Sequence, residues 1–180
     1  MFYIISVFNK NTTKKQEKMG ELYTEAVSAT LKALFPKIES LKQQQEEAIF
    51  QFIQRRDVFA VLPTGWGKSL IFQLIPTLCL YLHKKGLPYP EKAIVLVVCP
   101  LNSLVASHIK ELDSLGIRSC SLSGENVDEN GLFAGHYSFV FTSPEAIINE
   151  EKWRNMLRSD IYQKNIFGLV TDEAHVVPKW

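Results

Sequence analysis

Short apolar runs alternate along the chain with longer segments in which apolar residues recur every three or four positions. The runs are rich in β-branched residues and predict buried strands, whereas the longer segments predict helices. The expected strands are 57–62, 93–99, 137–142 and 166–171. The expected helices are 21–34, 43–54, 68–83 with a kink at Pro76, 102–115 and a short helix from Pro144. Strands that alternate with helices in this way indicate an α/β fold with a parallel sheet and right-handed crossovers.

The first 20 residues do not follow this alternation. The run at 1–8 is apolar but too short to cross a bilayer, and no basic residues precede it, so neither a membrane span nor a secretory signal is expected. A lysine-rich stretch follows over 10–18, interrupted by Glu17. We therefore predict a tail over 1–20 and one domain over 21–180, without contact to a membrane.

Composition narrows the class of protein only a little. The chain has 180 residues, of which 46% are hydrophobic, enough for one well-buried core. A formal net charge of +1 argues neither for nor against a polyanionic partner. The 3 cysteines are an odd number and form no CxxC pair, which favours buried thiols in a reducing compartment over a disulfide framework or a zinc site.

The strongest chemical signal is the sequence PTGWGKS over 63–69, between a predicted strand and a predicted helix. Gly65 and Gly67 allow a tight turn whose backbone N–H groups converge on phosphates, and the following helix adds its positive N-terminus. Lys68 can reach the β- and γ-phosphates, and the Ser69 hydroxyl can bind Mg²⁺. The alternative interpretation is a glycine-rich turn with a surface lysine, which the strand–loop–helix context disfavours.

A second signal, TDEAH over 171–175, follows the last predicted strand. Asp172 at a strand end can hold Mg²⁺ through its waters, and Glu173 can polarise an attacking water. On its own an Asp-Glu pair would be a solvated acidic turn, but a buried strand precedes this one. His175 is either a contact between two ligand sites or a polar cap of the turn.

Two predicted helices begin with residues that suit phosphate binding. Asn102 and Ser103 open one helix, and Thr142, Ser143 and Pro144 open another. Backbone N–H groups at such helix starts can bind the phosphates of a single strand. Ordinary helix capping by these residue types explains the same pattern, and without further context it is the favoured interpretation.

Taken together, the motifs resemble those of superfamily-two helicases and, in detail, the RecQ family. The resemblance rests on PTGWGKSLIFQLIP, on DEAH, on LKQQQEEAI around Gln45, on CPLNSL over 99–104 and on TSPE over 142–145. These segments occur in the family's order over about 35–180. The resemblance implies a RecA-like, three-layer P-loop domain with a mostly parallel sheet, incomplete at its C-terminus beyond the second motif.

The resemblance also implies roles for individual residues. Nucleotide contacts are expected from Lys42, Gln45, Thr64, Gly65, Gly67, Lys68 and Ser69, with Gln45 at the adenine edge. Mg²⁺ is expected at Ser69 and Asp172. Catalytic roles are expected for Lys68, Asp172, Glu173 and His175. Nucleic-acid contacts are expected from Leu101, Asn102, Ser103, Ser143, Pro144 and Trp180.

The activity that the resemblance implies is ATP- and Mg²⁺-dependent unwinding of duplex DNA, with 3′-to-5′ movement on single-stranded DNA, in recombination and repair. A nuclear location is the expectation, with a cytoplasmic one as the alternative. Two other functions stay open. The chain could be an incomplete motor that binds ATP and nucleic acid without unwinding, or it could be an RNA helicase, which SLIFQ and PLNSL disfavour.

Four positions depart from the family pattern. Leu62 stands where the first glycine of the GxxxxGKS pattern would be. Lys42 replaces the usual arginine and Ile38 replaces a frequent aromatic residue, so stacking on adenine is expected to be weaker. His108 occupies a position where glutamine is usual.

Overall fold

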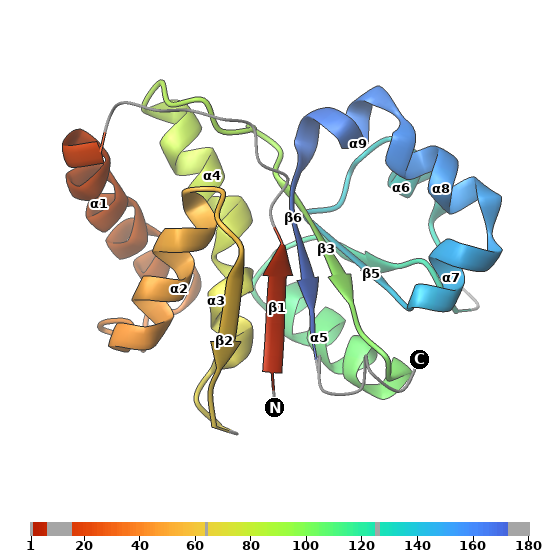
Figure 1. Ribbon diagram of the computed structural model, residues 1–180, viewed down its shortest axis with the longest axis horizontal. Helices are drawn as coiled ribbons and strands as arrows, with labels where there is room; N and C mark the ends of the chain where they lie inside the picture. Colours follow the sequence, from red (N-terminus) through yellow and green to blue (C-terminus); the bar gives the residue numbers. More distant parts are fainter. Residues whose placement is uncertain (1, 7–15, 64, 125–126, 173–180) are drawn as a thin grey trace.

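A six-stranded sheet lies between two groups of helices in the computed structural model, which describes residues 2–6, 16–63, 65–124 and 127–172 (Figure 1). The strands lie in the order β2-β1-β6-β3-β5-β4. Their bounds are β1 Phe2–Ser6, β2 Val58–Val61, β3 Ile94–Val98, β4 Ser119–Ser121, β5 Phe139–Thr142 and β6 Ile166–Thr171. The helices on the two faces of the sheet make this a three-layer α/β architecture, as predicted.

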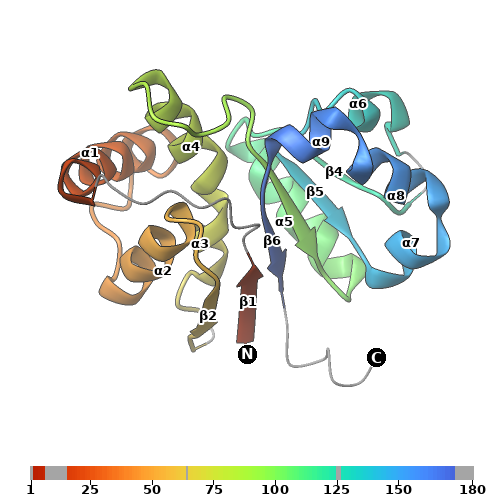
Figure 2. The same cartoon turned by 45° about the horizontal axis from the view of Figure 1, so that its top comes forward.

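The first group of helices packs on one face of the sheet. It comprises α1 Gln16–Leu34, α2 Gln43–Ile53, α3 Lys68–Gln73, α4 Ile75–Lys84 and α5 Asn102–Ser114. The second group covers the other face at β3 and β5 and comprises α6 Glu129–Phe133, α7 Pro144–Asn149, α8 Glu151–Arg158 and α9 Asp160–Asn165 (Figure 2). Within the described residues, no helix is long and apolar enough to cross a membrane.

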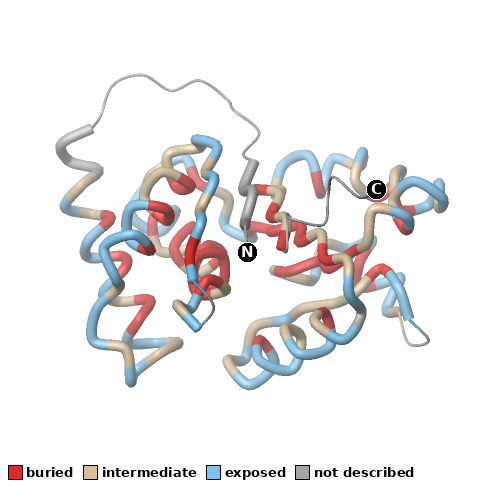
Figure 3. The backbone as a smooth tube through the Cα atoms, turned by 60° about the horizontal axis from the view of Figure 1, so that its bottom comes forward, coloured by how far each residue is buried: buried red, intermediate tan, exposed pale blue. Residues whose placement is uncertain are grey.

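Strands β6, β3, β5 and β4 form the parallel part of the sheet. Successive residues of β3 point to opposite faces, Val95 and Val97 into the core under α2–α5 and Ile94 and Leu96 into the core under α6–α9. Burial on both faces explains why β3 and most of β5 are continuous apolar runs rather than alternating ones. Buried positions accordingly follow the strands and the inner sides of the helices (Figure 3).

The helix expected over 68–83 is broken at its middle, as the proline predicted. Helix α3 ends at Gln73 and α4 begins at Ile75, with Pro76 in its first turn, where a missing N–H group costs nothing. The elements β4, α6, α8 and α9 were not predicted from the hydrophobic pattern. Helix α8 is mostly polar, and its buried residues Trp153 and Met156 anchor it in the core.

The N-terminal segment corrects the prediction of a tail over 1–20. Residues Phe2–Ser6 form β1, which pairs antiparallel with β2 on one side and with β6 on the other, and α1 already begins at Gln16. In the register, Ile4 lies opposite both Phe59 and Thr171. Without β1, the edges of β2 and β6 that face each other would have unpaired backbone groups. The short aromatic and β-branched segment Phe2–Ser6 pairs with both edges.

This topology brings the two candidate segments to one edge of the sheet. Strands β2, β6 and β3 run in the same direction, opposite to β1, so the loop after β2 and Asp172 after β6 lie at the same edge (Figure 1). Two strand spacings separate the ends of β2 and β6, a distance of about 10 Å. A ligand of nucleotide size can span that distance.

Candidate functional site

The loop after β2 is shaped by two glycines with left-handed backbone. Gly65 has a φ of +78° and Gly67 a φ of +70°, a region in which residues with a Cβ are strained. Gly67 is the N-cap of α3, and Lys68 is the first residue of that helix. The loop therefore delivers the chain directly into a helix N-terminus, as the motif predicts; Thr64 lies outside the described residues.

Lys68 is folded back into the loop rather than extended to solvent. Its side chain is buried, and its Nζ donates hydrogen bonds to Leu62 O at 3.2 Å and to Pro63 O at 3.3 Å. A buried ammonium group needs such partners, and here backbone carbonyls from the end of β2 supply them. These are weak acceptors compared with phosphate oxygens, so the lysine is held at the loop by bonds that an anionic ligand can replace.

Gln45 ties the same loop to the start of α2. Its side chain is buried, and its Nε2 donates to Trp66 O at 2.9 Å and to Gly67 O at 3.0 Å. Its Oε1 accepts a hydrogen bond from Lys42 N at 2.9 Å, which caps α2. The residue predicted to read the adenine edge is thus in contact with the predicted phosphate loop, 21 residues away in sequence.

A cavity of about 390 Å³ opens beside Gln45. Residues that line it include Phe35, Ile38, Lys42, Gln45, Trp66 and Ser69. The Lys42 ammonium lies 4.5 Å from the centre of the Trp66 ring, a cation–π contact. The sequence analysis gave Trp66 no role, although its place between the two loop glycines could have suggested one.

Two of the contacts that Asp172 makes fix it at the end of β6. Its backbone N donates to Val98 O at 2.9 Å, which extends the pairing with β3. Its Oδ2 lies 3.0 Å from His108 Nε2 on α5, and the side chain is only 4% exposed. The carboxylate predicted to hold the metal is therefore fixed on both sides. Glu173, His175 and Trp180 lie outside the described residues.

The donor set at this edge fits a Mg²⁺–nucleotide. Ser69 and Asp172 offer a hydroxyl and a carboxylate, the oxygen ligands that Mg²⁺ prefers, together with Lys68 and the loop backbone for phosphate. Ser69 is half-buried at the start of α3, and Asp172 follows β6, which lies two strand spacings from β2. No group of three or more His, Cys, Asp or Glu side chains that could hold a metal by themselves occurs in the described ranges. A Mg²⁺ ion at this edge would therefore take its remaining ligands from phosphate oxygens or water.

The two helix starts proposed for nucleic acid differ from each other. At α7, the Ser143 hydroxyl accepts a hydrogen bond from Ala146 N at 3.3 Å and Pro144 occupies the first turn, which is ordinary capping. At α5, the N-cap is Leu101, which is exposed and provides no side-chain hydrogen bond. The capping interpretation accounts for α7, whereas the α5 start, including Ser103, stays a candidate for phosphate contacts.

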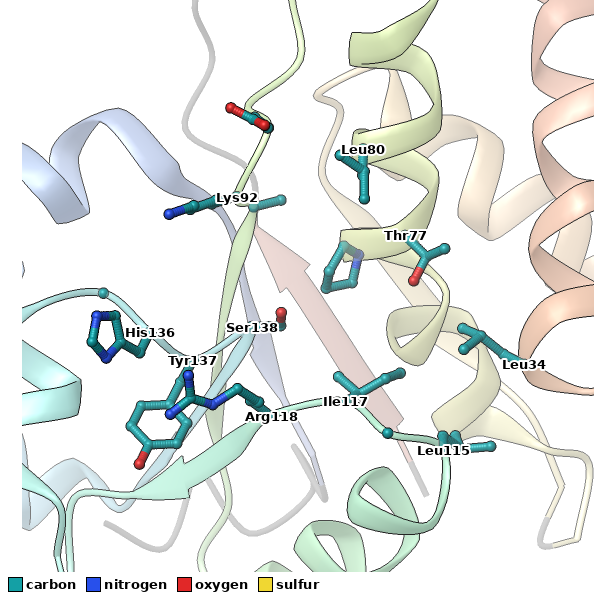
Figure 4. A pocket seen from close by; sticks show the side chains of 15 residues that line it. Leu34, Thr77, Leu80, Lys92, Leu115, Ile117, Arg118, His136, Tyr137 and Ser138 are labelled. Atoms are coloured by element: carbon teal, nitrogen blue, oxygen red, sulfur yellow. The ribbon is translucent and has the colours of Figure 1, made fainter.

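A larger cavity of about 450 Å³ is lined by a different set of residues (Figure 4). Lys92, Arg118 and Tyr137, which line it, precede β3, β4 and β5. The amino ends of the parallel strands therefore contribute to this cavity. The loop that contains Gly65 and Gly67, called the phosphate-type loop below, and Asp172 instead follow the carboxyl ends. In open α/β sheets the ligand crevice lies at the carboxyl ends. We therefore assign the candidate site to the smaller cavity.

Fold and site together define a RecA-like P-loop domain. The chain belongs to the DEAD/DEAH box helicase family, whose sequence model matches residues 42–180. It is 28% identical over 152 residues to the ATP-dependent DNA helicase Q1 of Rattus norvegicus, which covers 80% of this chain and 22% of that protein. It is 29% identical over 158 residues to the ATP-dependent DNA helicase RecQ of Haemophilus influenzae, covering 84% of this chain and 23% of that protein.

A third relative is the ATP-dependent DNA helicase hus2/rqh1 of Schizosaccharomyces pombe, 31% identical over 151 residues, which cover 79% of this chain and 11% of that protein. The chain thus spans less than a quarter of the length of these three relatives. The similarity to RecQ-type helicases agrees with the resemblance found in the motifs.

Proposed function

We propose that the chain is the nucleotide-binding domain of an ATP-dependent DNA helicase of RecQ type. The observation that carries this proposal is the arrangement around Gln45. A buried amide bonded to two carbonyls of the phosphate-type loop, beside a cavity of about 390 Å³, suits an adenine base at one end and phosphates at the other. The family match and the names of the relatives support the same activity.

In this proposal each polar group at the site has one task. Lys68 leaves the carbonyls of Leu62 and Pro63 and binds the terminal phosphates, while the N–H groups of the loop bind the phosphates between them and the adenosine. Ser69 and Asp172 hold Mg²⁺, which when bound neutralises charge on the phosphates. Glu173 accepts a proton from the attacking water.

For the nucleic acid, we propose that single-stranded DNA crosses the start of α5. The N-terminus of α5 supports this, because the N-cap Leu101 provides no side-chain hydrogen bond there and is 55% exposed to solvent. Movement in the 3′-to-5′ direction, unwinding of duplex DNA, a role in recombination and repair, and a nuclear location are proposed on the resemblance to RecQ helicases. The activity of the whole motor belongs to the same proposal.

Binding of a fluorescent ATP analogue tests the nucleotide part. The 180-residue chain should bind the analogue in the presence of Mg²⁺, and unlabelled ATP should displace it better than GTP. Equal displacement by both nucleotides would refute the assignment of Gln45 to adenine. No binding at millimolar analogue would refute the nucleotide site.

Binding of labelled single strands tests the nucleic-acid part. The chain should bind DNA with the salt dependence expected for phosphate contacts and should prefer DNA to an RNA strand of the same sequence. A preference for RNA would favour the RNA-helicase alternative. Binding of ATP and DNA by this chain without any unwinding is the result expected if it acts only as part of a larger motor.

A further inference from the structure

His108 occupies an unusual place for a histidine on a surface helix. It lies on α5, with only 13% of its side chain exposed, and its Nε2 is 3.0 Å from Asp172 Oδ2. The two residues are 64 positions apart in the sequence, and they join the helix after β3 to the end of β6. Nothing in the phosphate-type loop is needed for this contact.

Aromatic neighbours fix the orientation of the imidazole ring. The His108 ring is stacked on Phe141, with 5.7 Å between centroids and 9° between planes. The ring of Phe72 meets it edge-on, with centroids 5.7 Å apart and 70° between planes. Rotation of the imidazole would break both contacts, so its Nε2 stays directed at the carboxylate.

The chemistry of the pair then determines which atom donates. A carboxylate can only accept hydrogen bonds, so Nε2 carries the hydrogen and donates it to Asp172 Oδ2. The backbone N of Asp172 is already bonded to Val98 O, which fixes the main chain at the same point. With one oxygen held by His108, the orientation of the second carboxylate oxygen is determined as well.

We propose that His108 is a positioning residue that holds the Asp172 carboxylate in the orientation needed for Mg²⁺–nucleotide. The inference rests on the proposed function, because it assigns Asp172 to the metal. A partner of this kind orients a metal ligand and removes the rotational freedom that the ligand would otherwise lose on binding. The usual glutamine of the family at this position carries an amide N–H that can make the same donation, which explains how the two residue types can replace each other.

The test compares His108→Leu with His108→Gln in the 180-residue chain. Leucine fills the space between the aromatic rings without a donor, whereas glutamine keeps a donor. The measured quantity is the Mg²⁺ concentration that gives half-maximal binding of a fluorescent ATP analogue. We expect His108→Leu to raise that concentration about 10- to 100-fold, the usual effect of losing such a partner, and His108→Gln to restore it to within about threefold.

Nucleotide binding measured without Mg²⁺ is the matched control, and it should be the same in all three proteins. An unchanged Mg²⁺ dependence in His108→Leu, with nucleotide binding intact, would overturn the role of His108 and leave the proposed function standing. Failure of the unsubstituted chain to bind the analogue at any Mg²⁺ concentration would overturn both.

A double-mutant cycle examines the contact without any nucleotide. Thermal unfolding is measured for His108→Leu, for Asp172→Asn and for the pair together. If the two side chains interact as the structure has them, the loss of melting temperature in the pair is smaller than the sum of the single losses. Strictly additive losses would overturn the inference, whatever the chain binds.

Discussion

The ends of β2 and β6 each carry a buried charged group, but they hold it in different ways. At β2, Lys68 donates to backbone carbonyls no more than six residues away. At β6, Asp172 accepts from the imidazole of His108, a side chain 64 positions away on another element. The first arrangement is local and can be exchanged for a ligand, whereas the second is tertiary and depends on how α5 packs against the sheet.

The difference teaches which part of the site is prepared before a ligand arrives. The lysine must give up its carbonyl partners when phosphate oxygens bind, so the loop changes its hydrogen bonds. The aspartate can keep its bond to His108 when a metal binds its carboxylate. We infer that the β2 end adapts to the nucleotide and that the β6 end is a fixed reference for the metal.

The largest expected effect breaks the β2 side. Lys68→Ala removes the cation that would bind the terminal phosphates, and nucleotide affinity should fall by about 100-fold or more, as when a preorganised donor is deleted. The substitution also removes the two hydrogen bonds that the Lys68 Nζ donates to Leu62 O and Pro63 O. Titration of the fluorescent ATP analogue measures the loss, and circular dichroism checks the fold. Lys84→Ala, an exposed lysine at the end of α4, is the matched control. Equal losses in both variants would contradict the assignment.

A pair of glycines separates backbone strain from contact with Gln45. Both Gly65 and Gly67 have positive φ, so alanine at either should cost about 1–2 kcal/mol in unfolding free energy. A Cβ at Gly67 would also meet Gln45 Nε2 at 3.0 Å, whereas one at Gly65 meets nothing within 4 Å. Gly67→Ala should therefore destabilise the fold more than Gly65→Ala does. It should also weaken nucleotide binding more, because it displaces the Gln45 side chain. Urea denaturation of both variants measures the difference. Equal effects would show that the hydrogen bonds from Gln45 Nε2 to Trp66 O and Gly67 O are unimportant for stability.

Gln45→Glu tests directly the two hydrogen bonds that Gln45 donates to the loop. The carboxylate retains an acceptor for Lys42 N but loses the two donations to Trp66 O and Gly67 O and places negative charge against those carbonyls. We expect the preference for ATP over GTP to fall about tenfold, the value of one hydrogen bond of about 1.4 kcal/mol. Competition between the two nucleotides for the labelled analogue provides the measurement. A preference that stays at the unsubstituted level would assign base recognition to another residue.

The sequence predicted those parts of the molecule that depend on neighbours in the chain. Gly65, Gly67 and Lys68 lie in or directly after one loop. Each strand and helix predicted from residue 21 onward is present close to its expected bounds, although β4, α6, α8 and α9 were not predicted. The break before Pro76 follows from the missing N–H group of proline. Local pattern was sufficient for all of these.

What the sequence did not reveal depends on distant partners. The segment Phe2–Ser6 is a strand because two open edges, from β2 and β6, meet it, and neither edge is visible in a run of five residues. The contact between His108 and Asp172 likewise arises only when α5 packs beside β6. The one hint was that histidine replaces the family's glutamine there, which marked the position without naming its partner.

The smallest expected effect sharpens the comparison at the β2 end. Lys42→Arg restores the usual residue of the family at a position where the ammonium already lies 4.5 Å from the Trp66 ring centre. A planar guanidinium can stack on an adenine and on an indole, whereas an ammonium is a point charge, so ATP affinity should rise about two- to fivefold. Because the β6 end is untouched, the Mg²⁺ dependence of binding should not change. Titrations at low and high Mg²⁺ provide the measurement. A shift in Mg²⁺ dependence would mean that the two strand ends are not independent, and the distinction between an adaptable and a fixed end would fail.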